Sequence, residues 1–262
     1  EFIVEKSDLR QARLAERTLP ELQPGEILLA IDSFAFTANN ITYAELGERM
    51  AYWQFFPAAE DRHGIIPVWG FADVQESRHD AIRKGERIYG YFPMASHAVL
   101  RPDRVRDANF VESSPHRQKL PPAYNLYTRC AADPTWRSED EALYALLRPL
   151  FITSFLIDDF FAEENFFGAA KVILSSASSK TAFGLAHCIH KRRVVEVIGL
   201  ASEGNRGFVG GLGCYDRVLA YEELAQLDAA LPCVYVDFAG NAGFRAKVHG
   251  HFTDLRYSSA VG

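Results

Sequence analysis

Apolar and polar positions follow different patterns in the two halves of the chain. In the first half, short segments alternate apolar and polar side chains in places, and Gly or Pro residues separate them. Short, interrupted alternation of this kind is typical of strands in a small β-barrel or sandwich. The segments expected to be strands are residues 25–36, 66–77, 85–93 and 96–101. Residues 103–140 are polar and irregular, with several prolines, and we expect them to form a connector.

After Glu139 the pattern changes to helices that alternate with short apolar runs. Residues 141–148 and 151–161 have apolar positions at helical spacing. The apolar runs that follow are residues 172–174, 194–200, 217–220, 234–238 and 257–261. Strands that alternate with helices predict a parallel, doubly wound sheet. The expected fold class is therefore α/β, with a β-rich domain over residues 1–140 and a parallel-sheet domain over residues 141–262.

Composition narrows the function classes without naming one. The chain has 262 residues and a net charge of -6, which gives no electrostatic basis for binding nucleic acid or an anionic membrane. No apolar run approaches the ~18 to 20 residues that a membrane span requires. The aromatic fraction of 13% favours an aromatic-lined pocket. The cysteines are far apart and form no CxxC pair, so we expect no metal site and buried thiols in a cytoplasmic protein.

One segment has the pattern of a phosphate-binding turn. Residues 175–180 are small or polar, and they lie between the apolar strand 172–174 and a buried helical segment, 181–189. A helix N-terminus offers free backbone N–H groups and the positive end of its dipole to a pyrophosphate. Small residues let the turn stay tight, and glycine is the usual choice. The candidate ligands of this turn are Ser176, Ser178, Ser179, Lys180 and Thr181.

Other interpretations of the same turn stay open or fail on spacing. Ser176, Ser179 and Ala182 follow the spacing S-x-x-S-x-x-A without a glycine, so a structural turn capped by serines explains the segment equally well. A P-loop would need glycines at positions 174 and 179, which hold Leu174 and Ser179. A serine hydrolase is not predicted, because the chain has no G-x-S-x-G segment.

Several segments resemble the medium-chain dehydrogenase/reductase superfamily, on its zinc-free, quinone-oxidoreductase-like side. The closer resemblance is to a bacterial family of unknown function within that fold. The segments that carry it are Phe36–Tyr43, Pro67–Asp73, Tyr89–Met94, Leu174–Thr181 and Gly211–Asp216. The resemblance implies a GroES-like barrel for substrate contacts, followed by a Rossmann domain for NAD(P). It also implies further strands after Gly262, so we expect the Rossmann domain to be incomplete at its C-terminus.

Departures from the superfamily pattern concern the metal. Zinc-dependent members place a ligand cysteine in the segment that matches Ala38–Asn40, and a Gly-His-Glu where this chain has Gly70–Ala72. Neither ligand is present here, so we predict no catalytic zinc.

The choice of cofactor depends on the end of the second Rossmann strand. NAD enzymes usually have an acidic residue there for the adenosine ribose, and this chain has Ala201-Ser202. We therefore expect NADP, with NAD less favoured, and Ser202, Asn205, Arg206 and Lys180 at its 2′-phosphate. Glu203 is the residue that argues for NAD. The resemblance also implies that Asp237 and Gly240 lie beside the cofactor.

Chemistry without zinc requires a side-chain donor for the substrate carbonyl. The resemblance aligns Asn40 and Tyr43 with the polar positions of zinc-free relatives, so we name them as the candidate catalytic pair. Turn capping by Asn40 and core packing by Tyr43 remain the alternative interpretations. The run Tyr52–Phe56 is a candidate wall for an apolar pocket.

The sequence thus predicts a zinc-independent, NADP(H)-dependent oxidoreductase acting on a carbonyl, enone or quinone-like small molecule. The alternative is a non-catalytic nucleotide-binding or partner-binding protein that keeps the reductase fold. A small-molecule substrate is the expected partner, and neither nucleic acid nor a membrane is. A homodimer is the assembly that the resemblance allows.

Overall fold

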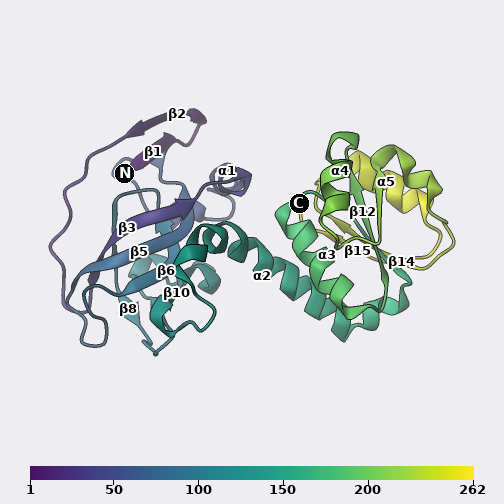
Figure 1. Cartoon of the computed structure of the whole chain (residues 1–262). Coiled ribbons are helices and arrows are strands. Elements are labelled where there is room, and N and C mark those ends of the chain that lie inside the picture. The colour runs from purple at the N-terminus through teal and green to yellow at the C-terminus, as the bar shows by residue number, and fades with distance from the viewer. The chain divides into compact units, whose positions relative to one another are not determined.

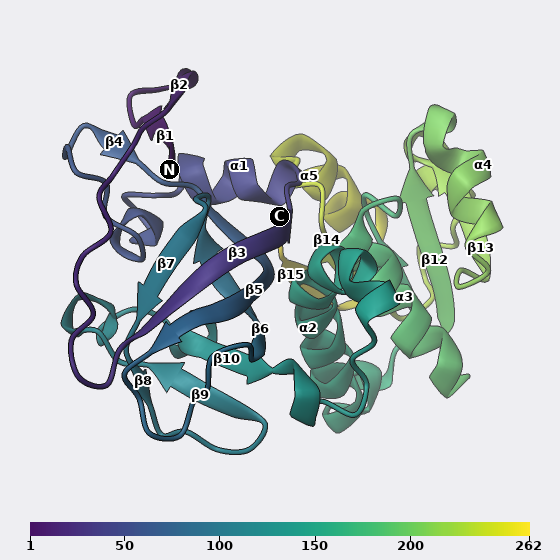
Figure 2. The same cartoon turned by 60° about the vertical axis from the view of Figure 1, so that its left-hand side comes forward.

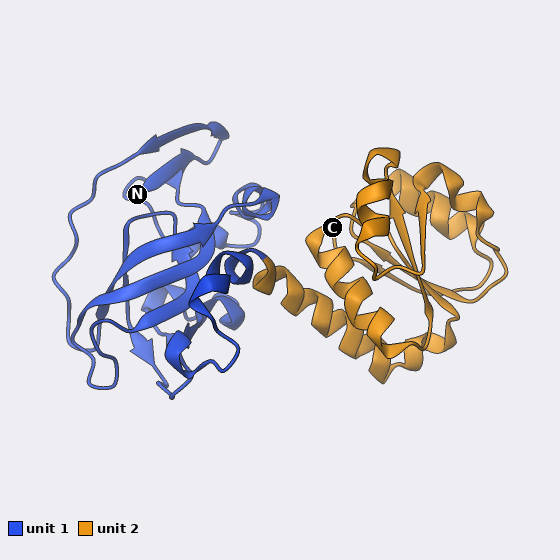
Figure 3. Cartoon of the chain, viewed as in Figure 1, with its two compact units in different colours: residues 1–146 blue, residues 147–262 orange.

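The computed structural model describes residues 1–262, and the chain divides into two compact units, Glu1–Leu146 and Leu147–Gly262 (Figure 3). The division falls inside helix α2 (Glu141–Glu163), which runs through Pro149 as one helix. The two helical segments expected on either side of that proline are therefore continuous. Proline fixes a helical φ and removes only one backbone donor, at a cost that a long helix can absorb.

The first unit is built on a seven-stranded antiparallel sheet in the order β7-β3-β5-β6-β10-β9-β8 (Figure 2). Its strands are β3 (Ile27–Ala35), β5 (Pro67–Ser77), β6 (Arg87–Pro93), β7 (His97–Leu100), β8 (Pro102–Asp103), β9 (Asn109–Glu112) and β10 (Leu126–Arg129). The four strands expected from alternation are confirmed. The sheet curls into a nearly closed barrel around apolar side chains such as Ile27, Leu29, Ile88 and Phe110.

The prediction that residues 103–140 form an irregular connector is wrong. Strands β9 and β10 lie within it and pair with one another, and β10 also pairs with β6. These strands are too short and too mixed in polarity to show alternation, and pairing with distant partners stabilises them. Gly90 in β6 makes room for this packing, because a Cβ there would lie 2.2 Å from the Tyr127 ring.

Smaller elements complete the first unit. A three-stranded sheet has the order β2-β1-β4 and was not expected from the sequence. Its strands are β1 (Phe2–Glu5), β2 (Asp8–Leu14) and β4 (His63–Gly64). Helix α1 (Ala38–Glu45) follows β3, and short 3-10 helices include η1 (Tyr52–Gln54), η2 (Pro115–Arg117) and η3 (Pro122–Asn125).

The second unit contains a five-stranded parallel sheet in the order β13-β12-β11-β14-β15 (Figure 1). Its strands are β11 (Lys171–Leu174), β12 (Glu196–Ala201), β13 (Arg217–Ala220), β14 (Cys233–Asp237) and β15 (Leu255–Ala260). The helices between them are α3 (Lys180–Arg192), α4 (Glu203–Gly211), the 3-10 helix η7 (Tyr221–Gln226) and α5 (Ala242–His251). The predicted doubly wound sheet is confirmed.

Both faces of this sheet are buried, which explains its continuous apolar runs. Val172 and Leu174 of β11 pack on one face with Leu185 of α3, whereas Ile173 packs on the other with Val248 of α5. From β11 the chain first extends the sheet to β12 and β13, and then returns to add β14 and β15 on the opposite side. This reversal places a topological switch point between the carboxyl ends of β11 and β14, where ligands bind in open α/β sheets.

No helix of the structure is both long enough and apolar enough to cross a membrane.

Candidate functional site

The turn after β11 is held to both neighbouring strands. Ser175 is fully buried, and its hydroxyl donates to a carboxylate oxygen of Asp237 at 2.9 Å. The same hydroxyl oxygen accepts the backbone N–H groups of Phe238 and Ala239. On the other side, the Ala177 N–H donates to the Leu200 carbonyl at 3.0 Å. The turn is therefore preorganised by contacts with β14 and β12.

Ser176 occupies the tightest part of the turn. Its φ is 47°, in the left-handed region that glycine adopts most easily. A serine in this conformation carries strain of about 1–2 kcal/mol. The Ser176 N–H donates to the Tyr221 hydroxyl at 2.8 Å. The expected small-residue turn is thus present, and the Tyr221 hydroxyl occupies one of its backbone amides.

Helix α3 begins at the end of this turn. Ser179 is its N-cap, and the Ser179 hydroxyl accepts the N–H of Ala182. Lys180 and Thr181 form the first helical turn and are partly exposed. The first N–H groups of a helix have no acceptor within the helix, so this end can bind an anion. Serine capping and phosphate binding are therefore compatible here.

Helix α3 and strand β12 pack closely around the turn. Ala182 is fully buried, and a Cβ on Gly184 would lie 2.7 Å from the Ser154 hydroxyl of α2. In β12, a Cβ on Gly199 would lie 2.9 Å from both Ala177 and Tyr215. Gly184 and Gly199 thus lie beside the turn, where α3 packs against α2 and β12 packs against the turn, and serines form most of the turn itself.

The carboxyl end of β12 brings the predicted 2′-phosphate residues close to the turn. Ser202 is the N-cap of α4, and the Asn205 side-chain amide donates to the Ser178 hydroxyl at 3.3 Å. Arg206 forms ion pairs with Glu203 at 3.5 Å and with Glu223 at 3.2 Å. The structure therefore places Arg206 near the site, already paired with two carboxylates.

Glu223 was missed by reasoning from the sequence. It follows β13, and its carboxylate accepts the Ala220 N–H at 2.9 Å. That hydrogen bond, together with Arg206, holds the pKa of the Glu223 carboxyl below its usual range. The available signal was its position just after the apolar run 217–220, because carboxyl ends of parallel strands meet at one edge of a sheet.

Asp237 and Gly240 lie at the end of β14. Asp237 is fully buried, and it accepts from Ser175, from the Ala239 N–H and from Arg245 at 3.3 Å. Gly240 has a φ of 63°, and a Cβ there would lie 3.0 Å from the Gly262 carbonyl carbon. Asp237 therefore joins the turn to β14, which is a supporting position beneath the site.

In the first unit, Asn40 holds helix α1 in place. Its side-chain oxygen accepts the Thr37 N–H at 2.7 Å, and its side-chain nitrogen donates to the Pro67 carbonyl at 2.9 Å. Thr37 and Asn40 together form a capping box, and Asn40 is only 4% exposed. Both ends of its amide are used to position α1 and, through it, Tyr43.

Tyr43 lies in a cluster of tyrosines. Its ring centroid is 4.8 Å from that of Tyr52, 5.7 Å from that of Tyr91 and 6.3 Å from that of Tyr124. The hydroxyls of Tyr52 and Tyr124 are hydrogen-bonded at 3.2 Å. Burial raises the pKa of Tyr43 above its usual value, against the opposing effect of Trp69. The hydroxyl is therefore protonated at neutral pH and can donate a hydrogen bond.

The aromatic run expected as a pocket wall divides between two clusters. Tyr52, Phe55 and Phe56 pack with Tyr43 and Tyr91, whereas Trp53 packs with Val4, Ala44 and Ile66. No group of three His, Cys, Asp or Glu side chains in residues 1–262 is arranged to hold a metal ion.

An antiparallel GroES-like barrel followed by a parallel Rossmann sheet, with a tight strand-to-helix turn at the switch point, defines the medium-chain dehydrogenase/reductase fold. The chain belongs to the family described as "Protein of unknown function (DUF2855)", whose model matches residues 34–262. Among curated proteins, none matches the chain.

Solved structures share the fold at low sequence identity. CurA from Vibrio vulnificus in complex with NADPH is 15% identical, with a TM-score of 0.62, over 98% of this chain and 69% of that one. The quinone oxidoreductase from Thermus thermophilus, also described with NADPH, is 13% identical, with a TM-score of 0.55, over 100% and 79%. Human synaptic vesicle membrane protein VAT-1 homolog-like protein is 13% identical, with a TM-score of 0.56, over 99% and 76%.

Proposed function

We propose that this protein binds NADP(H) at the carboxyl edge of its parallel sheet and is a zinc-independent oxidoreductase. The observation that carries the proposal is the turn at the switch point, which leads from β11 into the N-terminus of α3 with Lys180 in the first helical turn. Its geometry fits a pyrophosphate, because the turn is tight, anchored on both sides and followed by a helix dipole. CurA and the Thermus quinone oxidoreductase, which share the fold, are described with NADPH.

Each residue at this edge has a defined task in the proposal. The N-terminus of α3 and the turn around Ser176 hold the pyrophosphate. The 2′-phosphate is held by Lys180, Asn205 and Arg206. To bind it, Arg206 gives up its ion pair with Glu203 and pairs with the phosphate instead. Arg206 and Glu203 are partly exposed, so their ion pair costs little to break.

NADP(H), when bound, would supply a hydride. Tyr43 is the proposed proton donor to the oxygen of a carbonyl, enone or quinone-like substrate. The Tyr43 hydroxyl carries a proton at neutral pH and can donate a hydrogen bond to that oxygen. Asn40 positions Tyr43 by capping α1. The proposed location is the cytoplasm, because no disulfide joins any of the four cysteines, as in reducing compartments.

A second candidate function is nucleotide binding without hydride transfer. The observation that favours it is the hydrogen bond from the Ser176 N–H to the Tyr221 hydroxyl, which occupies a backbone amide of the proposed pyrophosphate turn. In that case the protein would bind a nucleotide without converting a substrate.

Titration of the 262-residue chain with NADPH and NADH, followed by cofactor fluorescence, tests the cofactor. We expect saturable binding with NADPH preferred, and no binding of either at millimolar levels would overturn the proposal.

Turnover on a panel of quinones and enones then separates the two functions. Tyr43→Phe keeps the ring in its cluster and removes the hydroxyl. We expect it to retain NADPH binding and to lose about 10²-fold or more in kcat. Cofactor binding without turnover on any member of the panel would favour the second candidate.

A further inference from the structure

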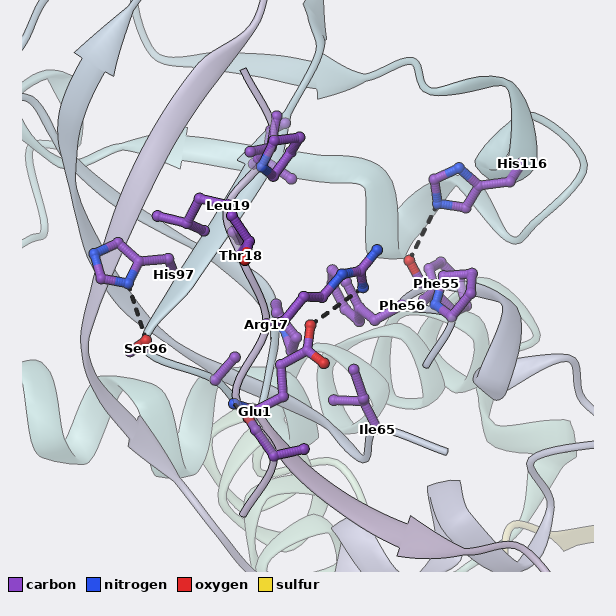
Figure 4. Close-up of a pocket in the computed structure, with 18 of the residues that line it drawn as sticks. Glu1, Arg17, Thr18, Leu19, Phe55, Phe56, Ile65, Ser96, His97 and His116 are labelled. Atoms are coloured by element: carbon purple, nitrogen blue, oxygen red, sulfur yellow. Dashed lines mark hydrogen bonds and ion pairs between the residues drawn. The ribbon is translucent and has the colours of Figure 1, made fainter. Parts of the chain in front are cut away.

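A cavity lies wholly within the first unit. Its volume is about 640 Å³, which is within the range of small-molecule pockets. Its walls come from the segment that joins β2 to β3, from residues 55–57 after η1, from β7 and from η2. Figure 4 shows Leu19, Phe55, Phe56 and Ile65 among the residues that line it. None of the residues assigned to the proposed cofactor site contributes to this cavity.

The cavity has apolar walls with polar groups on its border. Phe55 and Ile65 are almost fully buried. Glu1 and Arg17 form an ion pair at 3.2 Å, and the His97 ring is hydrogen-bonded to the Ser96 hydroxyl at 2.9 Å (Figure 4). These polar groups already have partners within the protein. The surface left for contact with a ligand is therefore mainly apolar.

One residue of the lining, Arg117, is a buried cation with open donors. It is 1% exposed, and its guanidinium lies 4.7 Å from the Phe56 ring centroid and 5.1 Å from that of Phe55. Nη1 donates to the Tyr127 hydroxyl at 3.0 Å. Nε and Nη2 are buried and have no hydrogen-bond partner.

The other buried charge of the lining does not pair with Arg117. Glu112 is 3% exposed, and its carboxylate accepts the Ser114 N–H at 2.8 Å, the Ser114 hydroxyl and the Arg101 N–H at 3.4 Å. These bonds turn its oxygens toward the 101 and 114 backbone. Arg117 therefore lies in the lining without an ion pair.

A buried guanidinium that lacks an anion is costly, and cation–π contacts offset only part of that cost. Nε and Nη2 form the edge of the guanidinium that binds a carboxylate through two parallel hydrogen bonds. Neither atom has a hydrogen-bond partner in Arg117, and the aromatic rings beside the guanidinium offer contacts to an apolar body.

We propose that this cavity binds a small carboxylic acid with an apolar chain or ring, whose carboxylate pairs with Nε and Nη2 of Arg117. The Phe56 ring lies 4.7 Å from the guanidinium carbon and is only partly buried, so a movement of this side chain would give the carboxylate access to the buried Nε and Nη2. The apolar body then lies against Phe55, Ile65 and Leu19. This site is separate from the proposed dinucleotide site and does not depend on it.

Calorimetric titration of the full chain with octanoate and with 1-octanol tests the site. The two ligands share an alkyl chain and differ in charge. We expect one octanoate per chain, bound at least tenfold more tightly than 1-octanol. Equal affinity for the two ligands, or no octanoate binding at millimolar levels, would overturn the proposal. Neither measurement uses a dinucleotide, so failure of the proposed oxidoreductase function would leave this result unaffected.

Arg117→Met supplies the matching variant, because Met keeps much of the apolar volume and removes the charge. We expect it to bind octanoate no better than 1-octanol, whereas Arg106→Met, at an exposed arginine, should bind like the wild type. Wild-type octanoate affinity in Arg117→Met would contradict the assignment. If that variant does not fold, the comparison of acid and alcohol on the wild-type chain still decides the question.

Discussion

The backbone N–H of Ser176 donates a 2.8 Å hydrogen bond to the Tyr221 hydroxyl, which joins the turn after β11 to the segment after β13. The Tyr221 ring is held at the same place by an edge-to-face contact with Phe244, at a centroid distance of 4.7 Å. A side chain from a neighbouring strand end therefore occupies an amide in the proposed pyrophosphate site.

Tyr221→Phe should release that amide while leaving the ring contact with Phe244. Because a cofactor would no longer displace a hydrogen bond worth about 0.5–1.5 kcal/mol, we expect NADPH to bind several-fold more tightly. Fluorescence titration of the variant and the wild type gives the two dissociation constants. Weaker binding by the variant would instead make the Tyr221 hydroxyl a direct cofactor contact.

Lys180→Ala should weaken NADPH more than NADH, because the lysine is assigned to the 2′-phosphate that only NADPH carries. We expect a loss of about tenfold for NADPH and little change for NADH. Lys191→Ala, in the last turn of the same helix, is the matched control and should bind both cofactors like the wild type. An equal loss for NADPH and NADH would refute the assignment of Lys180.

Glu223→Gln should strengthen the preference for NADPH. The substitution removes a carboxylate from Arg206 and keeps an oxygen that can accept the Ala220 N–H. Arg206 is then freer to pair with the 2′-phosphate, and we expect a several-fold gain for NADPH alone. Glu222→Gln makes the same charge change at an exposed neighbour and should have little effect. If both variants gain equally, the effect is general electrostatics and not the release of Arg206.

Cys233 should make the protein less stable at alkaline pH. Burial in β14 raises the pKa of its thiol to about 11, compared with the ordinary value of 9.0, although nearby Lys171 opposes the shift. The unfolded chain therefore loses this proton at lower pH than the folded chain does. The contribution to stability is complete below pH 9.0 and is lost as the pH rises toward 11.

The expected loss is about 2 kcal/mol across that window. Urea unfolding at about pH 8 and about pH 10.5 measures it. Cys233→Ala should show a smaller decrease in unfolding free energy between the two values than the wild type shows. An identical decrease in both proteins would mean that other groups cause the alkaline effect.

Much of the second unit could be predicted from the order of its residues. Strands that are buried on both faces consist of apolar runs, so Val172–Leu174 and the run at 234–238 indicate a parallel sheet from the sequence alone. The small-residue turn before Lys180 was also visible, because tight strand-to-helix turns restrict residue size. The barrel could be predicted less completely, because β9 and β10 are stabilised by pairing with distant strands and show no local pattern.

The sequence by itself thus determined the two kinds of domain, the position of the turn and the candidate residues on either side of it. These are local properties, set by periodicity and side-chain size. Only the tertiary structure decided which groups meet: Tyr221 at the Ser176 amide, Glu223 at Arg206, and no carboxylate at Arg117. Such pairings join residues far apart in the chain, and the free energy of each depends on burial and distance, which no local pattern encodes.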